Sequence, residues 1–191
     1  LYDTAKWGGT KGTFVQANGL VERGYKVCIV AKTAAPDWFS LKCDFVQSPQ
    51  FNAVDIPLSN IVIGTWFPTV QVACAAQKGI PVHYCRGYEA QQPGLSDNQQ
   101  AYIKTIYQLP TVKIANSPHV ARLLKDNFNA EAYVVKNDIN HNIFYPQQNA
   151  TSTEPSQRQR VLIVGPYEVT WKGVKDCLNA CALLVQHYGL D

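Results

Sequence analysis

Short, mostly apolar runs alternate along this chain with longer segments in which apolar residues recur every three or four positions. A short apolar run bounded by turn residues is typical of a strand buried on both faces, and the wider spacing is typical of a helix that covers it. Such runs are Val27–Val30, Asn60–Gly64, Pro81–Cys85, Val112–Ala115, Ala132–Val135 and Val161–Gly165. The alternation predicts an α/β fold with a doubly wound, Rossmann-like parallel sheet, because parallel strands need crossover connections.

Composition and charge exclude several classes of protein. The 191 residues are 46% hydrophobic and only 16% charged, which excludes disorder for most of the chain. The net charge of +3 comes without a run of Lys or Arg, so we expect no nucleic acid as a partner. No apolar stretch approaches the roughly 20 residues that cross a bilayer. The six cysteines form no C-x-x-C pair, and we expect them to be reduced, as in a cytoplasmic protein.

A polar segment divides the chain. Residues 147–160 are rich in Ser, Thr and Gln and predict a linker. We therefore expect an amino-terminal domain over 1–146, its first strand clipped, and the start of a second, truncated α/β domain over 161–191. In the second domain the run at Val161 predicts a strand, and Lys172–Tyr188 predicts a helix.

A glycine-rich segment precedes the first helix. Gly8, Gly9 and Thr10 lie in a predicted loop over Lys6–Gly12, where backbone N–H groups could approach a phosphate or a sugar hydroxyl. A tight turn without a ligand is the alternative interpretation. The glycines do not form a G-x-G-x-x-G fingerprint, and no G-K-[ST] begins the helix, so neither a dinucleotide site nor a P-loop is expected.

Four motifs in order resemble those of the GT-B glycosyltransferases of the large retaining family 4, also called group 1. Gly8-Gly9, a helix and then Gly24–Val27 resemble the opening of that family. Asn116–Pro118 resembles its V-x-x-S segment, and Lys136–Asn140 with Phe144–Pro146 resembles the segment where its first domain meets the second. Gly165 followed by Lys172-Gly173 resembles the start of its nucleotide-sugar domain.

The resemblance implies transfer of a sugar from a nucleotide-sugar donor to a saccharide or lipid-linked acceptor, in polysaccharide synthesis. It implies that 1–146 binds the acceptor, with Gly8, Gly9 and Thr10 beside the acceptor or a phosphate, and that Lys172 and Gly165 hold the donor diphosphate. Arg86 and Glu89 are the expected catalytic-site residues. No metal or cofactor is expected. A cytoplasmic location with peripheral contact to the inner face of the membrane would be common in the family.

Two departures from the family pattern leave alternatives open. Pro166 stands where the family commonly has Arg, and Arg86 stands where it has His; an Arg cannot act as a base. The nearby His83 is expected on the opposite side of its strand from Arg86, as a satisfied core residue. The acidic E-x7-E pair that binds the donor sugar in the family is not found in the chain. A sugar-nucleotide 2-epimerase of the same fold and a non-catalytic sugar-binding homologue therefore remain as alternatives.

Overall fold

The computed structural model describes residues 1–137, 139–146 and 161–189. The chain divides into two compact units, Leu1–Asp138 and Ile139–Asp191, and each is described here by itself. The first unit thus ends earlier than the predicted boundary at 146. The predicted linker over 147–160 lies outside the described residues.

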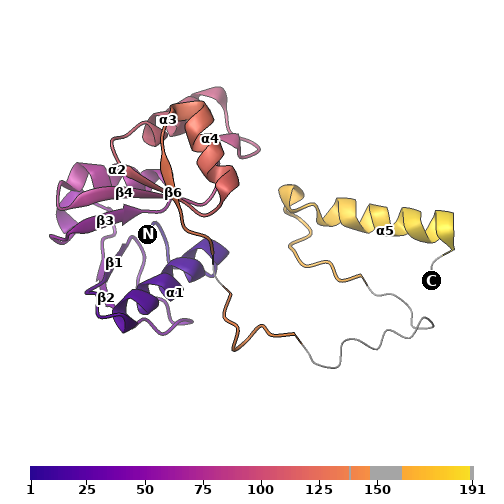
Figure 1. Ribbon diagram of the computed structural model, residues 1–191, viewed down its shortest axis with the longest axis horizontal. Helices are drawn as coiled ribbons and strands as arrows, with labels where there is room; N and C mark the ends of the chain where they lie inside the picture. The colour runs from indigo at the N-terminus through magenta and orange to yellow at the C-terminus, as the bar shows by residue number, and fades with distance from the viewer. Residues whose placement is uncertain (138, 147–160, 190–191) are drawn as a thin grey trace. The chain divides into compact units, whose positions relative to one another are not determined.

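All strand pairings in the first unit are parallel. The strands are β1 (Cys28–Ala31), β2 (Asp44–Gln47), β3 (Ile61–Gly64), β4 (Ile80–Cys85), β5 (Val112–Ala115) and β6 (Ala132–Val134). β1 pairs with β2, and β3, β4, β5 and β6 form a four-stranded sheet in that order. The predicted α/β class is confirmed, and the parallel sheet with its connecting helices is consistent with a Rossmann-like fold (Figure 1).

Helices connect the strands of the larger sheet. The helices of this unit are α1 (Gly8–Glu22), η1 (Ala53–Asp55), α2 (Phe67–Ala76), η2 (Glu89–Gln91), α3 (Asp97–Tyr107) and α4 (Pro118–Phe128). α3 begins at Asp97, because Ser96 and Gln99 form a reciprocal capping box just before it. α4 begins at Pro118, with Ser117 as its cap and the proline in its first turn.

The alternating side chains of β4 separate two layers of helices. Cys85 belongs to an apolar cluster with residues of α3 and α4, the helices that lie next to each other in Figure 1. The Tyr84 hydroxyl points the other way and accepts a hydrogen bond of 3.0 Å from Gln16 of α1. Because neighbouring side chains of a strand face opposite sides, α1 and the α3–α4 pair cover opposite faces of β4.

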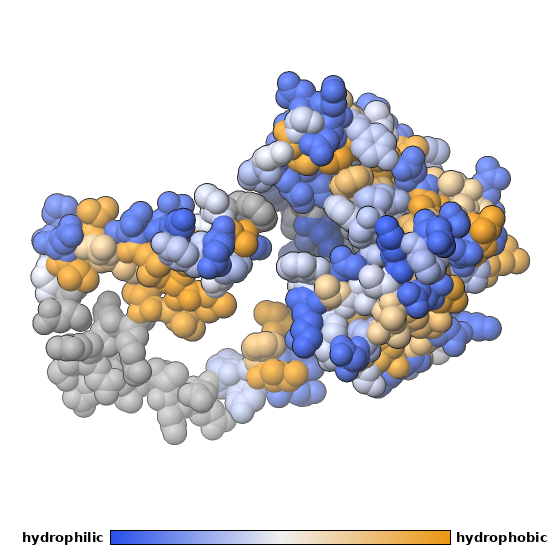
Figure 2. Space-filling view, turned by 180° about the vertical axis from the view of Figure 1, so that it is seen from behind, coloured by the Kyte–Doolittle hydropathy of each residue, from blue (hydrophilic) through white to orange (hydrophobic). Residues whose placement is uncertain are grey.

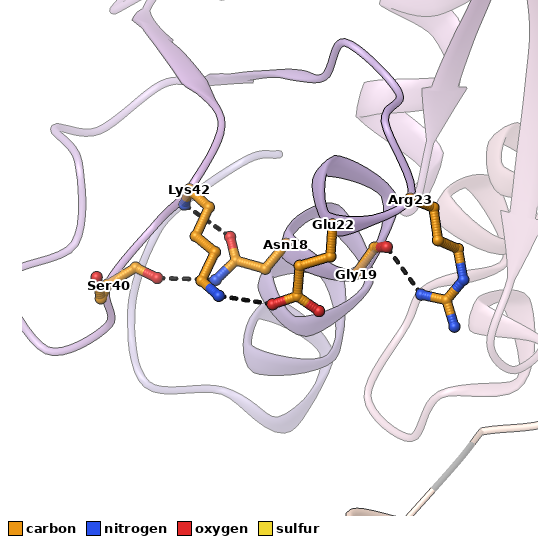
Figure 3. A network of polar contacts seen from close by, with 6 residues as sticks. All are labelled: Asn18, Gly19, Glu22, Arg23, Ser40 and Lys42. Carbon is orange, nitrogen blue, oxygen red and sulfur yellow. Dashed lines mark hydrogen bonds and ion pairs between the residues drawn. The ribbon is translucent and has the colours of Figure 1, made fainter.

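The second half of α1 is tied to the segment that leads into β2 (Figure 3). Asn18 Nδ2 donates to the Ser40 carbonyl at 2.8 Å, and Asn18 Oδ1 accepts from the Lys42 backbone N–H at 2.8 Å. Lys42 Nζ lies 2.6 Å from Glu22 Oε1. On the buried side of the same helix, Phe14 packs against the rings of Trp38 and Phe39. One helix therefore holds the long β1–β2 connection by both polar and aromatic contacts.

The second unit contains η3 (Thr170–Lys172) and α5 (Val174–Tyr188). The strand predicted at Val161 is wrong: residues 161–164 are extended without a ladder, and Leu162 is 87% exposed. No strand in the described part of this unit is available to pair with it, and an isolated strand cannot satisfy its own backbone groups. Figure 2 shows apolar side chains gathered on the surface of this unit.

Within the described residues, no helix combines the length and the apolar composition needed to cross a membrane.

Candidate functional site

A pocket of about 700 Å³ lies at the carboxyl ends of three neighbouring strands of the first unit. Arg86 follows β4, Asn116 follows β5, and Lys136 lies two residues after β6. Its described lining residues are Arg86, Gly87, Tyr88, Gln91, Asn116, Ser117, Pro118, His119, Val120, Leu123, Lys136 and Asn137. Ligands of open parallel sheets bind beyond the carboxyl ends of the strands, which makes this pocket the candidate site.

Arg86 connects the pocket to the start of α1. Its guanidinium donates to the Gly9 carbonyl and to Thr13 Oγ1, and it lies over the Tyr84 ring with Cζ 5.0 Å from the centroid. Burial lowers the pKa of Arg86 below its usual value, yet a guanidinium stays charged in proteins. Two of its five N–H donors make these bonds to the described residues.

Asn116 holds the ends of β4 and β5 together. Its backbone N–H donates to the Cys85 carbonyl at 3.1 Å, and its Nδ2 donates to the Arg86 carbonyl at 3.1 Å. Its buried Oδ1 has no hydrogen-bond partner among the described residues. The next residue, Ser117, caps α4 by accepting from the Val120 N–H. The pocket floor is therefore built from a fixed strand end and a helix start.

Gly8, Gly9 and Thr10 form the first turn of α1, so the loop predicted over Lys6–Gly12 is wrong from Gly8 onward. The helix extends to Gly8 because Thr10, Phe14 and Ala17 of the same face are buried. Arg86 approaches this turn so closely that a Cβ on Gly9 would lie 3.0 Å from its Nη1. The structure thus brings the predicted residues Gly9 and Arg86 together, although neither Gly8, Gly9 nor Thr10 lines the pocket.

Glu89 lies in the interior, outside the pocket lining. It is 8% exposed, its carboxylate accepts from the Tyr107 hydroxyl, and its backbone N–H donates to that hydroxyl oxygen at 3.2 Å. Burial raises the pKa of Glu89, and the Tyr107 hydrogen bond acts in the opposite direction. The same hydroxyl lies 3.0 Å from the Gly87 carbonyl. Glu89 and Tyr107 therefore fix the turn that carries Arg86 and Tyr88; a catalytic role for Glu89 stays a prediction.

His83 is fully buried on the face of β4 opposite to Arg86, as predicted. It was expected to be a satisfied core residue, but neither ring nitrogen has a hydrogen-bond partner among the described residues. Its ring packs 4.8 Å from that of Tyr107. Burial, followed by the positive charge of Lys113, lowers the pKa of His83 to about 3. The neutral imidazole belongs to the core and does not reach the pocket.

In the second unit, the two residues predicted to hold the donor diphosphate are close to each other. A Cβ on Gly165 would lie 2.8 Å from Val174 Cγ2 and 3.9 Å from Lys172 Cβ. Lys172 ends η3 and is not in the first turn of the following helix as predicted, because Gly173 intervenes with a positive φ of 69°. Gly165 and the Lys172 segment therefore lie close together within this unit, and their binding of a diphosphate stays a prediction.

Two lining residues, His119 and Lys136, were missed as candidates by the sequence analysis. His119 is in the first turn of α4, and Lys136 follows β6; both are exposed at the rim of the pocket. Their positions could have indicated them: His119 lies two residues after the helix cap Ser117, and Lys136 lies two residues after the end of β6. Among the described lining residues there is no Asp or Glu, so the pocket presents positive charge only.

Comparison of the chain with protein-family models, with curated proteins and with solved structures found no match.

Proposed function

We propose that this protein is a retaining glycosyltransferase of the GT-B type, in which the pocket of the first unit binds the acceptor. The observation that supports the proposal most is the convergence of Arg86, Asn116 and Lys136 at the carboxyl ends of β4, β5 and β6. A polar acceptor needs such a set of hydrogen-bond donors and acceptors around an open pocket. The four sequence motifs support the reaction class, and the pocket supports an acceptor site in the first unit.

The second unit supplies the proposed donor group. Lys172 lies beside Gly165, whose lack of a side chain leaves room for Val174 and the Lys172 segment to pack closely. When the sugar leaves, negative charge grows on the diphosphate, and a positioned ammonium group stabilises that charge. Arg86 would bind an acceptor hydroxyl or phosphate, and it cannot remove a proton. The proposed chemistry therefore rests on positioning and charge stabilisation.

The test is incubation of the protein that carries this sequence with a panel of nucleotide-sugars, followed by NMR of the released or transferred sugar. We expect transfer or slow hydrolysis with the anomeric configuration retained. Lys172→Ala removes the diphosphate contact, and we expect it to lower kcat/KM by about 100-fold or more, as loss of a charge-stabilising donor does. Lys175→Ala is the matched control, because Lys175 lies in the same unit with its Nζ over the Tyr167 ring.

Other outcomes would contradict the proposal. Isomerisation at C2 of the sugar would assign the protein to the 2-epimerases. Saccharide binding without any turnover would favour the non-catalytic homologue. An equal loss of activity in Lys172→Ala and Lys175→Ala would remove the specific role of Lys172.

A further inference from the structure

The pocket of the first unit combines positive charge with a polar and aromatic lining. Arg86 and Lys136 supply the charge, and no described lining residue is acidic. The guanidinium of Arg86 is partly buried and has no carboxylate partner among the described residues. Burying an unpaired charge costs free energy, and a bound anion would offset that cost. The only described ion pairs are Lys42–Glu22 and Lys125–Glu131, and neither contains a residue of the pocket lining.

The arrangement of these groups suits a phosphate. Arg86 has three further N–H donors besides the two that bind Gly9 and Thr13 among the described residues. At the start of α4, the proline has no N–H, and the His119 N–H has no acceptor within its own helix. A helix start adds partial positive charge to that of the side chains. Guanidinium, ammonium and helix N–H groups thus converge on one pocket.

The rest of the lining suits a saccharide. Gln91 and Asn137 carry amides that can both donate to and accept from hydroxyl groups. Tyr88 offers an aromatic ring, which Tyr107 and Phe128 support from behind with centroid distances of 5.4 and 5.7 Å. The volume of about 700 Å³ lies within the range of small-ligand pockets.

We propose that this pocket binds a phosphorylated saccharide, with the phosphate held by Arg86, Lys136 and the start of α4 and the sugar hydroxyls held by the amides. The inference rests on the proposed function only where it identifies this ligand as the acceptor. The binding itself requires no donor sugar and no catalysis, so it can be measured separately.

The experiment is isothermal titration of the protein with glucose 6-phosphate, glucose and inorganic phosphate at low salt. We expect glucose 6-phosphate to bind at least about tenfold more tightly than either fragment, because each fragment loses one set of contacts. We expect the affinity to fall as salt is added, because Lys136 is exposed and its charge is screened. Addition of vesicles of phosphatidylinositol, and of phosphatidylcholine as a control, tests for a lipid headgroup as the source of the phosphate.

Lys136→Gln is the variant of choice, because Lys136 is exposed and its loss leaves the Arg86 contacts with α1 intact. We expect it to weaken glucose 6-phosphate binding by about tenfold, the loss of one charge-assisted hydrogen bond. Lys104→Gln removes the same charge from the exposed face of α3, outside the pocket, and we expect it to bind like the unaltered protein.

Three results would overturn the inference: equal affinity for glucose and glucose 6-phosphate, equal affinity for inorganic phosphate and glucose 6-phosphate, or binding to phosphatidylinositol vesicles without binding of glucose 6-phosphate. If glucose 6-phosphate binds but no sugar is ever transferred, the ligand class stands and the transferase proposal fails. If transfer occurs only to unphosphorylated acceptors and glucose 6-phosphate does not bind, the transferase proposal stands and the ligand class fails.

Discussion

His83 couples the stability of the first unit to pH. In the folded chain its pKa is lowered to about 3 by burial and then by Lys113, whereas an unfolded histidine titrates near 6.5. Between these values the unfolded chain binds more protons, so the free energy of unfolding falls as the pH falls below about 6.5. For this residue alone the loss between pH 7.5 and pH 5 is about 2 kcal/mol.

His83→Phe removes this titrating group while keeping an aromatic ring beside Tyr107. We therefore expect the variant to lose about 2 kcal/mol less stability than the unaltered protein between pH 7.5 and pH 5, measured by urea unfolding with circular dichroism. Glu89 opposes the trend, because its raised pKa favours the folded chain at lower pH, but it is present in both proteins. Ile103→Val is the control, because it alters the same core without changing a titrating group. If the stability of His83→Phe depends on pH as strongly as that of the unaltered protein, the assignment to His83 is wrong.

At the same scale, sequence reasoning located Arg86 but misjudged its surroundings. The position of Arg86 after an apolar run placed it at a strand end, and strand alternation gave its side opposite to His83. The burial of Glu89 depends on Tyr107, which lies eighteen residues further along the chain, and no local pattern carries that information. The ring nitrogens of His83 have no hydrogen-bond partner among the described residues. This too depends on which helices cover β4, and packing between distant segments leaves no local pattern in the sequence.

At the scale of elements, Asn18 is the polar link between α1 and the connection before β2 (Figure 3). Asn18→Ala deletes two hydrogen bonds to backbone groups of Ser40 and Lys42, and we expect it to lower the free energy of unfolding by about 1–2 kcal/mol in urea unfolding. Glu22→Gln is the control, because an exposed ion pair such as Glu22–Lys42 contributes little. A larger effect from Glu22→Gln than from Asn18→Ala would contradict this account.

The elements themselves were partly predictable. Runs such as Pro81–Cys85 gave strands, because continuous burial on both faces leaves a local apolar signal. β2 was missed, since only Phe45 and Val46 separate Asp44 from Gln47 and two apolar residues do not define a period. The apolar run at Val161 gave the opposite error: composition favours a strand, but a strand also needs a neighbour, and the described part of its unit offers none.

At the scale of the whole molecule, residues 161–164 form a segment that we expect to promote self-association. Four consecutive β-branched or leucine side chains are largely exposed or half-exposed, with backbone groups outside any ladder. Such a segment can pair with its copy in another chain. Leu162→Lys places a charge in its centre, and we expect it to reduce concentration-dependent light scattering at constant helix content. Lys104→Gln serves as the control for altered net charge; unchanged scattering in Leu162→Lys would refute the assignment.

Arg86 lines the pocket, and its guanidinium also binds α1, a helix that does not line the pocket. A ligand that binds the Arg86 guanidinium would weaken or strengthen its hydrogen bonds to Gly9 and Thr13. Such coupling is reciprocal. If opening of the first turn of α1 changes the free energy of ligand binding, then ligand binding changes the free energy of opening that turn by the same amount. If the pocket binds the proposed ligand, we expect hydrogen exchange near the glycine-rich start of α1 to change on binding.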